Sequence, residues 1–224
     1  MGLDWNPMAR AKPGYEAEHA RILELDLDSL EADERERTIE RFHEICEAAY
    51  ETLGAPRVGY DQAANQWLNE LIQESGKLKG LSQGEAEDFV RKEFEEMHGF
   101  FVLDLLPPSA GLPVYVPAGN YEGVDRYTFR GKFLDVVSDL LGDELHERAW
   151  ECMSPGELKE YGETLLRIGR EYAREHGCSE LETQRDPPEP DDDEAPEFRA
   201  HILFSAAHWC LFWSERGHGL EPYF

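Results

Sequence analysis

A short row of polar side chains interrupts the most apolar stretch of the sequence. His201, Ser205 and His208 follow one another at steps of four and three residues, so they share one face of a helix predicted over residues 198–215. If that face borders an internal cavity, the imidazoles could act as acid and base groups or as metal ligands. The alternative is that the row marks the side of the helix that meets water. The two histidines lie about 10 Å apart along the helix axis, too far to grip one ion easily, so the row predicts no metal site.

Four of the eight histidines have a glutamate three residues before them. On inward-facing helices this spacing builds carboxylate-bridged di-metal sites in four-helix bundles. A chain this rich in glutamate also produces such pairs by chance, and Glu40 and Glu95 lie beside the apolar stripes of their helices. We therefore expect exposed pairs on helix faces, with a metal-dependent helical-bundle enzyme as the alternative. The pairs are Glu16/His19, Glu40/His43, Glu95/His98 and Glu215/His218.

A long segment rich in proline, glycine and tyrosine, residues 107–131, is the candidate recognition surface. Loops of this length are often functional. Arg126, Arg130 and Lys132 form a small basic island in a very acidic chain. Such an island could hold a carboxylate or a phosphate, or it could pair with neighbouring acids. The residues expected to contact a ligand or partner are Tyr115, Asn120, Tyr121, Asp125, Arg126 and Arg130.

Motifs of established chemistry are missing from the rest of the sequence. It contains no phosphate-cradling glycine loop, no H-E-x-x-H, no G-x-S-x-G turn and no zinc-type pair of cysteines. The N-terminal residues lack the layout of a signal peptide, so we expect the four widely spaced cysteines to be reduced thiols. The sequence therefore assigns no catalytic residue, no metal and no cofactor.

Helices must position these residues, because apolar residues recur at three- and four-residue steps along most of the chain. The clearest helix start is Ser154-Pro155-Gly156-Glu157, where serine caps, proline takes the first helical position and glutamate completes a capping box. Gly177 is the expected stop of that helix. The helix over 198–215 is apolar nearly all round, which predicts a central helix. The predicted helices span about 15–27, 33–53, 61–74, 83–98, 155–176 and 198–215.

These elements predict a mainly α fold, with six to seven helices around a single core in one domain over residues 1–224. A small irregular or β-hairpin insertion is expected near residues 107–131. Residues 182–197 hold four prolines and eight acids, so they are predicted to be a mobile connection within the domain. The tail over 217–224 ends in two aromatic residues, and we expect it to pack back onto the fold beside Trp5.

The charge of the chain limits the classes of partner. It has 48 acidic residues against 22 basic ones, a net charge of −26, and 41% apolar residues, which are too many for a chain that never folds. Only six of the basic residues are lysines, a pattern that favours adaptation to a salt-rich cytoplasm, where the Debye length falls to about 3 Å at ~1 M salt. The acidity excludes general nucleic-acid binding and anionic membrane surfaces. No apolar stretch reaches the ~20 residues that cross a bilayer.

The sequence therefore predicts a soluble cytoplasmic protein that works as a non-enzymatic binding or interaction module through its 107–131 loop. The expected partner is an unknown protein or a small anionic ligand, and a homodimer is considered as well. The first alternative is the metal-dependent carboxylate/histidine enzyme. The second is an acidic mimic of nucleic acid, which requires carboxylates in a row at phosphate-like spacing.

Overall fold

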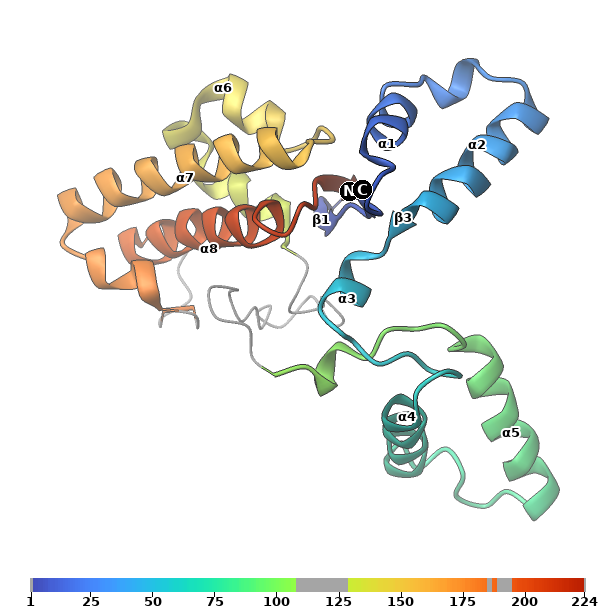
Figure 1. Ribbon diagram of the computed structural model, residues 1–224. Helices are drawn as coiled ribbons and strands as arrows, with labels where there is room; N and C mark the ends of the chain where they lie inside the picture. The colour runs from blue at the N-terminus through green and yellow to red at the C-terminus, as the bar shows by residue number, and fades with distance from the viewer. Residues whose placement is uncertain (1, 108–128, 185–186, 189–194, 224) are drawn as a thin grey trace. The chain divides into compact units, whose positions relative to one another are not determined.

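The computed structural model describes residues 2–107, 129–184, 187–188 and 195–223 (Figure 1). Over these residues the chain is mainly helical, as predicted, with eight α-helices and two short antiparallel sheets. The chain divides into two compact units: unit 1 holds Met1–Ala49 and Ala110–Phe224, and unit 2 holds Tyr50–Ser109. That the chain forms a single domain around one core stays a prediction. Thermal or urea unfolding would test it, because a single domain unfolds in one transition and two independent units unfold in two.

Two long antiparallel helices, α7 (Pro155–His176) and α8 (Pro196–Ser214), lie side by side in unit 1 (Figure 1). The predicted capping box of α7 is confirmed: the Ser154 hydroxyl accepts from the N–H of Glu157, and the Glu157 carboxylate accepts from the N–H of Ser154 at 2.9 Å. The helix ends at Gly177, whose φ of 73° is the left-handed conformation that glycine adopts without strain. Local chemistry thus fixes both ends of α7.

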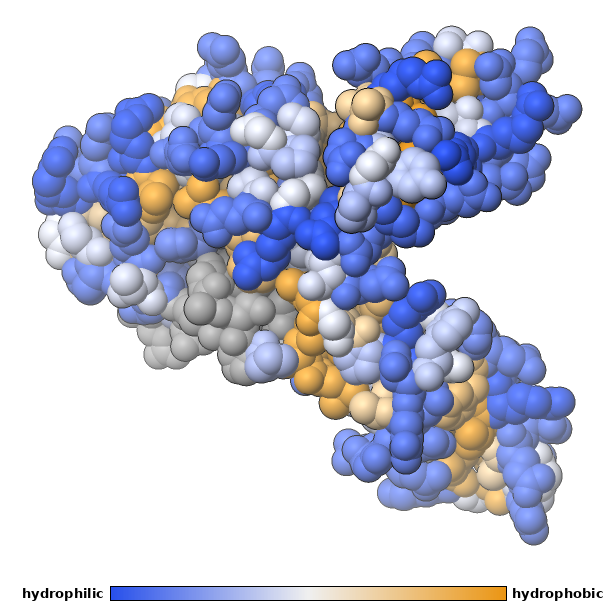
Figure 2. All heavy atoms as spheres, viewed as in Figure 1, coloured by the Kyte–Doolittle hydropathy of each residue, from blue (hydrophilic) through white to orange (hydrophobic). Residues whose placement is uncertain are grey.

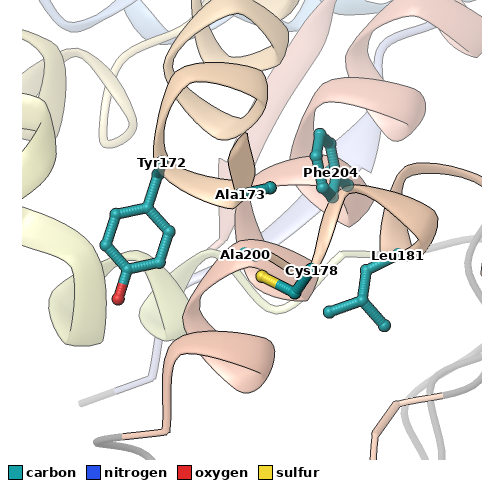
Figure 3. Close-up of a cluster of buried hydrophobic side chains, with 6 residues drawn as sticks. All are labelled: Tyr172, Ala173, Cys178, Leu181, Ala200 and Phe204. Carbon is teal, nitrogen blue, oxygen red and sulfur yellow. The ribbon is translucent and has the colours of Figure 1, made fainter. Parts of the chain in front are cut away.

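Helix α8 is the central helix that its apolar circumference predicts. Thirteen of its 19 residues are buried, among them Trp209 and Trp213. Glycines let α7 approach it closely, since a Cβ on Gly162 would lie 2.7 Å from the Cβ of Cys210. Figure 3 shows one buried cluster of this interface, which contains Tyr172, Ala173, Cys178, Leu181, Ala200 and Phe204.

The two ends of the chain pair with each other in unit 1. Strand β1 (Asp4–Pro7) runs antiparallel to β4 (Leu220–Tyr223), with Trp5 opposite Pro222, which confirms the predicted packing of the tail beside Trp5. The Trp5 indole is fully buried and donates from Nε1 to the carbonyl of Ala149 at 2.9 Å. Its ring lies 5.5 Å from the ring of Trp209, so the paired termini belong to the same core as α8.

The predicted continuous helix over 33–53 is interrupted at residues 46–48, and helix resumes in α3 (Ala49–Thr52). Helix α2 ends at Ile45, because Cys46 is extended (φ −102°, ψ 156°) and pairs with Ala11 in the sheet of β2 and β3. The periodicity of the sequence missed this change because Cys46, although extended, is still buried in one cluster with Ile22 and Ile45. The sequence also missed α6, whose pattern is interrupted at Gly142 (φ 71°). The remaining elements of unit 1 are β2 (Arg10–Ala11), α1 (Glu16–Leu23), η1 (Leu27–Ser29), α2 (Ala32–Ile45), β3 (Cys46–Glu47), η3 (Gly131–Val137), α6 (Ser138–Arg148) and η4 (Ser179–Thr183).

Unit 2 is built on two helices that the sequence predicts well, α4 (Gln62–Glu74) and α5 (Gln83–Glu96). The same region contains the short α3 (Ala49–Thr52) and η2 (Leu103–Leu105). Its core consists of Val58, Ala64, Leu68, Ile72 and Val102, and apolar side chains of α5 pack against this cluster. No residue of α5 is itself fully buried, so the core of unit 2 is thin. None of the helices in the described chain is both long and apolar enough to cross a membrane.

Two predicted connections fall largely outside the described residues. The β-hairpin or irregular insertion near 107–131 lies there except at its ends, and so do eight of the sixteen residues of the mobile connection over 182–197, whose last two residues, Pro196 and Glu197, belong to α8. The first residue of that connection, Glu182, belongs to η4, and its carboxylate accepts hydrogen bonds from Arg170 at 2.6 and 3.0 Å. A mobile connection would therefore begin later than residue 182.

Candidate binding groove

The polar row on α8 lies inside the protein. His201 and Ser205 are each only 2% exposed, and their Nδ1 and Oγ atoms are 3.4 Å apart. His208 is half-buried and donates from Nε2 to the carbonyl of Glu182 at 2.7 Å. The interpretation as a solvent face is therefore wrong for His201 and Ser205, and the side chain of His208 ties α8 to η4. None of the three lines the groove of unit 1 described below.

The four glutamate/histidine pairs lie on four separate elements of the described chain. They belong to α1, to α2, to the end of α5 in unit 2 and to the segment after α8. His19 lies 3.1 Å from the carbonyl of Ala9 and His218 lies 2.9 Å from that of Met8, so both rings donate to backbone. Within the described residues no group of three or more histidine, cysteine or acidic side chains could hold a metal ion.

The candidate recognition loop is described only at its last residues. Tyr115, Asn120, Tyr121, Asp125 and Arg126 lie outside the described residues.

Arg130 is the described member of the predicted site. Its guanidinium lies 3.4 Å from the carboxylate of Asp4, and its side chain is 13% exposed. Of the two roles considered for the basic island, Arg130 thus shows the pairing with a neighbouring acid.

A groove that the sequence did not predict lies in unit 1, with a volume of about 900 Å³. Its walls come from the residues between β1 and α1, from α1 itself, from the start of α7 and from the turn after α8. The apolar part of the lining consists of Met8, Ala11, Pro13, Ala20, Leu23, Met153 and Pro155. No local spacing connects these segments, because they are far apart in the sequence. The one signal that could have found the groove is the predicted packing of the 217–224 tail beside Trp5, because both Gly217 and Met8 line the groove.

Backbone hydrogen bonds hold these walls together. Leu220 and Met153 exchange two of them, at 2.9 and 3.1 Å, and the N–H of Met8 donates to the carbonyl of Gly219 at 2.9 Å. A Cβ on Gly219 would lie 2.2 Å from the Met153 carbonyl oxygen, so only glycine permits this approach. The start of α7 is thereby fixed against the first residues of the chain.

Two arginines border the groove in different states. Arg10 donates to Glu47 from Nε and from a terminal nitrogen, at 3.0 and 2.8 Å, and to the carbonyl of Arg216 at 2.9 Å. Arg216 is half-buried, its guanidinium stacks 3.6 Å from the ring centroid of Phe212, and it donates to the Phe212 carbonyl. In the part of the chain that the structure describes, Arg216 makes no ion pair with a carboxylate.

The acidic side of the groove is largely engaged. The carboxylate of Glu16 accepts from the N–H of Gly14 at 3.0 and 3.1 Å. Hydrogen bonds from Ser154 lower the pKa of Glu157, which also pairs with Arg148 at 2.7 Å. Glu24 at the end of α1 completes the acidic lining. Arg10 and most of the acidic groups are thus already paired within the protein. The guanidinium of Arg216 is therefore the charged group of the groove that best suits a negatively charged ligand.

In the described lining, the thiol and the imidazole are both held in states that do not favour nucleophilic attack. Cys152 is exposed, but partial desolvation of its sulfur and the nearby Glu221 carboxylate raise the pKa of its thiol, which disfavours the thiolate. His19, the one histidine of the described lining, donates its Nε2 hydrogen to a backbone carbonyl. The groove therefore combines an apolar wall with an accessible cation, an arrangement that suits binding. No family model, curated protein or solved structure matches this chain.

Proposed function

We propose that the protein is a non-enzymatic binding module and that the groove of unit 1 holds a small amphipathic anion. The observation that carries the proposal is an apolar groove of about 900 Å³ with Arg216 at its border. Ligand pockets typically measure about 300–1,000 Å³, with apolar walls and few orienting polar groups. An apolar body would lie along Met8, Leu23 and Pro155, and a carboxylate would pair with Arg216.

Two probes with the same kind of tail and opposite charge test this ligand class. Decanoate should bind and raise the melting temperature, because a ligand at about 100 times its Kd stabilises a folded protein by ~2.7 kcal/mol. Decyltrimethylammonium should bind less tightly, because it places a cation beside Arg216 and Arg10. Isothermal titration calorimetry measures both affinities. Tighter binding of the cationic probe would contradict the proposal.

A matched pair of substitutions on α1 locates the site. Ala20→Trp fills the groove, since Ala20 belongs to its lining, and should abolish decanoate binding. Ala17→Trp places the same side chain on an exposed position of the same helix outside the lining and should leave binding unchanged. Equal affinities of the two variants would show that decanoate binds elsewhere.

The loop over 107–131 remains part of the proposal as a surface for a partner protein. Support for this role comes from its tyrosines and its basic residues. Replacing Tyr115 and Tyr121 with alanine should leave decanoate binding unchanged if the loop serves a separate partner. A loss of decanoate affinity in this double variant would assign the loop to the groove instead.

We also propose that the excess of carboxylates is an adaptation to a salt-rich cytoplasm. The scarcity of lysine supports this proposal, and the four free cysteines fit a reducing compartment. Unscreened repulsion should lower the melting temperature as salt falls from ~1 M to ~0.01 M, because the Debye length grows from about 3 Å to about 30 Å. A melting temperature that does not change with salt would contradict it.

A further inference from the structure

His218 lies behind the wall of the groove, in the turn that follows α8. The two residues before it, Arg216 and Gly217, line the groove, whereas the side chain of His218 is fully buried. Its ring packs edge-on against the ring of Trp213, with 5.3 Å between the two centroids. The turn therefore holds a titratable group inside the protein, next to the residues that border the proposed anion site.

Hydrogen bonds fix the position of this ring and of its proton. The Nδ1 atom of His218 lies 2.9 Å from the carbonyl oxygen of Met8, and a carbonyl can only accept, so Nδ1 carries the hydrogen of the neutral ring. Met8 itself lines the groove, and its N–H donates to the carbonyl of Gly219 at 2.9 Å. A further proton can therefore bind only at Nε2, and it leaves the hydrogen bond to Met8 intact.

The surroundings of the ring oppose this further proton. Burial lowers the pKa of His218, and two nearby cations, Arg10 and Arg216, lower it further. The Met8 carbonyl and the Glu47 carboxylate act in the opposite direction. Arg10 and Glu47 are hydrogen-bonded to each other at 3.0 and 2.8 Å, so their effects on the ring largely cancel. Arg216 makes no ion pair with a carboxylate in the described chain, so it is the cation whose effect on His218 a ligand can change.

We propose that an anion in the groove binds together with a proton on His218, so that the protein holds its ligand more tightly as the pH falls. The inference rests on the proposed function, because it requires the anion to pair with Arg216. A bound anion offsets the positive charge that Arg216 presents to the ring, and a protonated His218 places a second cation behind the anion. The proton comes from the solvent. Both effects express one coupling free energy, so they are equal in size.

Other titratable groups also affect an anion in the groove. Carboxylates ordinarily have pKa values of about 4 and stay charged between about pH 5.5 and 7.5. His19 lines the groove, with its Nε2 atom 3.1 Å from the carbonyl of Ala9. Hydrophilic side chains predominate on the visible face of unit 1 (Figure 2), and their titration changes the field that any anion meets. A test of the inference must therefore follow the proton on His218 itself.

Nuclear magnetic resonance of the isotope-labelled wild type measures the coupling at the ring. The ring signals of His218, assigned by triple-resonance experiments, are titrated with pH in the presence and absence of saturating decanesulfonate, an anion that does not itself titrate in this range. The anion should raise the midpoint of His218 by about 0.5 pH or more, which corresponds to a Kd about threefold lower for the protonated protein. A midpoint that saturation does not raise, or a ring that stays neutral in both samples, overturns the inference and leaves the proposed function standing.

A matched pair of histidine substitutions assigns the proton by calorimetry. Titration of decanesulfonate at pH 5.5, in two buffers of different ionisation enthalpy, counts the protons taken up with each anion. His218→Gln keeps a donor for the Met8 carbonyl but cannot bind the proton, so it should lose the uptake that the wild type shows. His43→Gln removes an exposed imidazole of α2 outside the lining and should keep that uptake.

The outcomes separate the inference from the function on which it rests. Proton uptake that persists in His218→Gln assigns the proton to another group, such as His19, and overturns the inference. Decanesulfonate that binds the wild type with no proton uptake overturns it as well, while the proposed function stands. Decanesulfonate that does not bind at pH 5.5 or at pH 7.5 contradicts the proposed function itself. The resonance titration uses only the wild type, so it decides the matter even if His218→Gln does not fold.

Discussion

Helices α8 and α4 each contain two charged residues, but they differ in how much of each helix the fold buries. In α8, 13 of 19 residues are buried, so the chain's own packing explains why charges are excluded. In α4 three of 13 residues are buried, and the same explanation accounts for only one face of the helix. A low charge density in the sequence therefore does not by itself distinguish a buried helix from one that is buried on a single face.

The largest expected effect is the loss of stability when a carboxylate is introduced into α8, compared with the same change in α4. Ala207→Asp places a charge at a fully buried position of α8, where an unpaired charge costs about 3–5 kcal/mol of stability. Ala63→Asp makes the same change at an exposed position of α4 and should alter stability by less than about 0.5 kcal/mol. Urea unfolding followed by circular dichroism at low protein concentration measures both. Similar losses in both variants would mean that α4 is as buried as α8.

Close packing against α8 should give the next largest effect. Gly162→Ala puts a Cβ 2.7 Å from that of Cys210 and 3.3 Å from the carbonyl of Ala207. Overpacking of this kind costs about 1–3 kcal/mol, which outweighs the helix-favouring effect of alanine, up to ~1 kcal/mol.

Gly156→Ala is the control for that substitution, because a Cβ on Gly156 meets nothing within 4 Å. It lies in the same helix α7 and should be neutral or slightly stabilising. The free energies of unfolding of the two variants, measured in urea, test the prediction. If both alanines stabilise the protein, α7 and α8 are less tightly packed than described.

The smallest expected effect is a pH dependence of stability that arises from His218, in the turn after α8. His218 is fully buried, with its ring edge-on to that of Trp213 at 5.3 Å. Burial lowers its pKa, Arg10 and Arg216 act in the same direction, and the Met8 carbonyl and Glu47 oppose the shift. The folded state thus binds the proton less readily than the unfolded chain, where the pKa is about 6.5. His218 therefore stabilises the fold above pH 6.5, and this contribution is lost as pH falls below that value.

His218→Gln tests this linkage by the slope of stability against pH. Between about pH 7.5 and 5.5 the free energy of unfolding of the wild type should fall more steeply than that of the variant. This window excludes most of the titration of the acidic residues, whose ordinary pKa values are about 4. The readout is the difference in slope, so a constant loss of stability in the variant does not affect it. Parallel slopes would show that the ring titrates equally in the folded and unfolded states.

The sequence predicted those features that depend on a few neighbouring residues or on the composition of a whole helix. The capping box at Ser154 is made by four consecutive residues, and the central position of α8 follows from apolar residues on every side. The tail docks beside Trp5 as predicted, but the tail residue that is buried there is Leu220, whereas Tyr223 is 70% exposed. These features depend on few tertiary contacts, so the fold class could be predicted.

The groove and the state of the polar row could not be predicted in the same way. The groove exists because Gly217, Met8 and Met153 are brought together by strand pairing, and nothing in the spacing of these residues encodes that. His201 and Ser205 look like a solvent face on a helical wheel, but a central helix is buried even along its polar side. The burial of a polar group depends on what the rest of the chain places over it.

The pairing of β1 with β4 also determines when the protein can finish folding. Trp5 is synthesised more than two hundred residues before its strand partner, Leu220–Tyr223. While the residues in between are translated, the Trp5 side chain cannot pack against β4. It is then either exposed to water or covered by another part of the chain. Closing a loop of this length carries a high entropic barrier, so the joining of the two ends should be a late step in the maturation of unit 1.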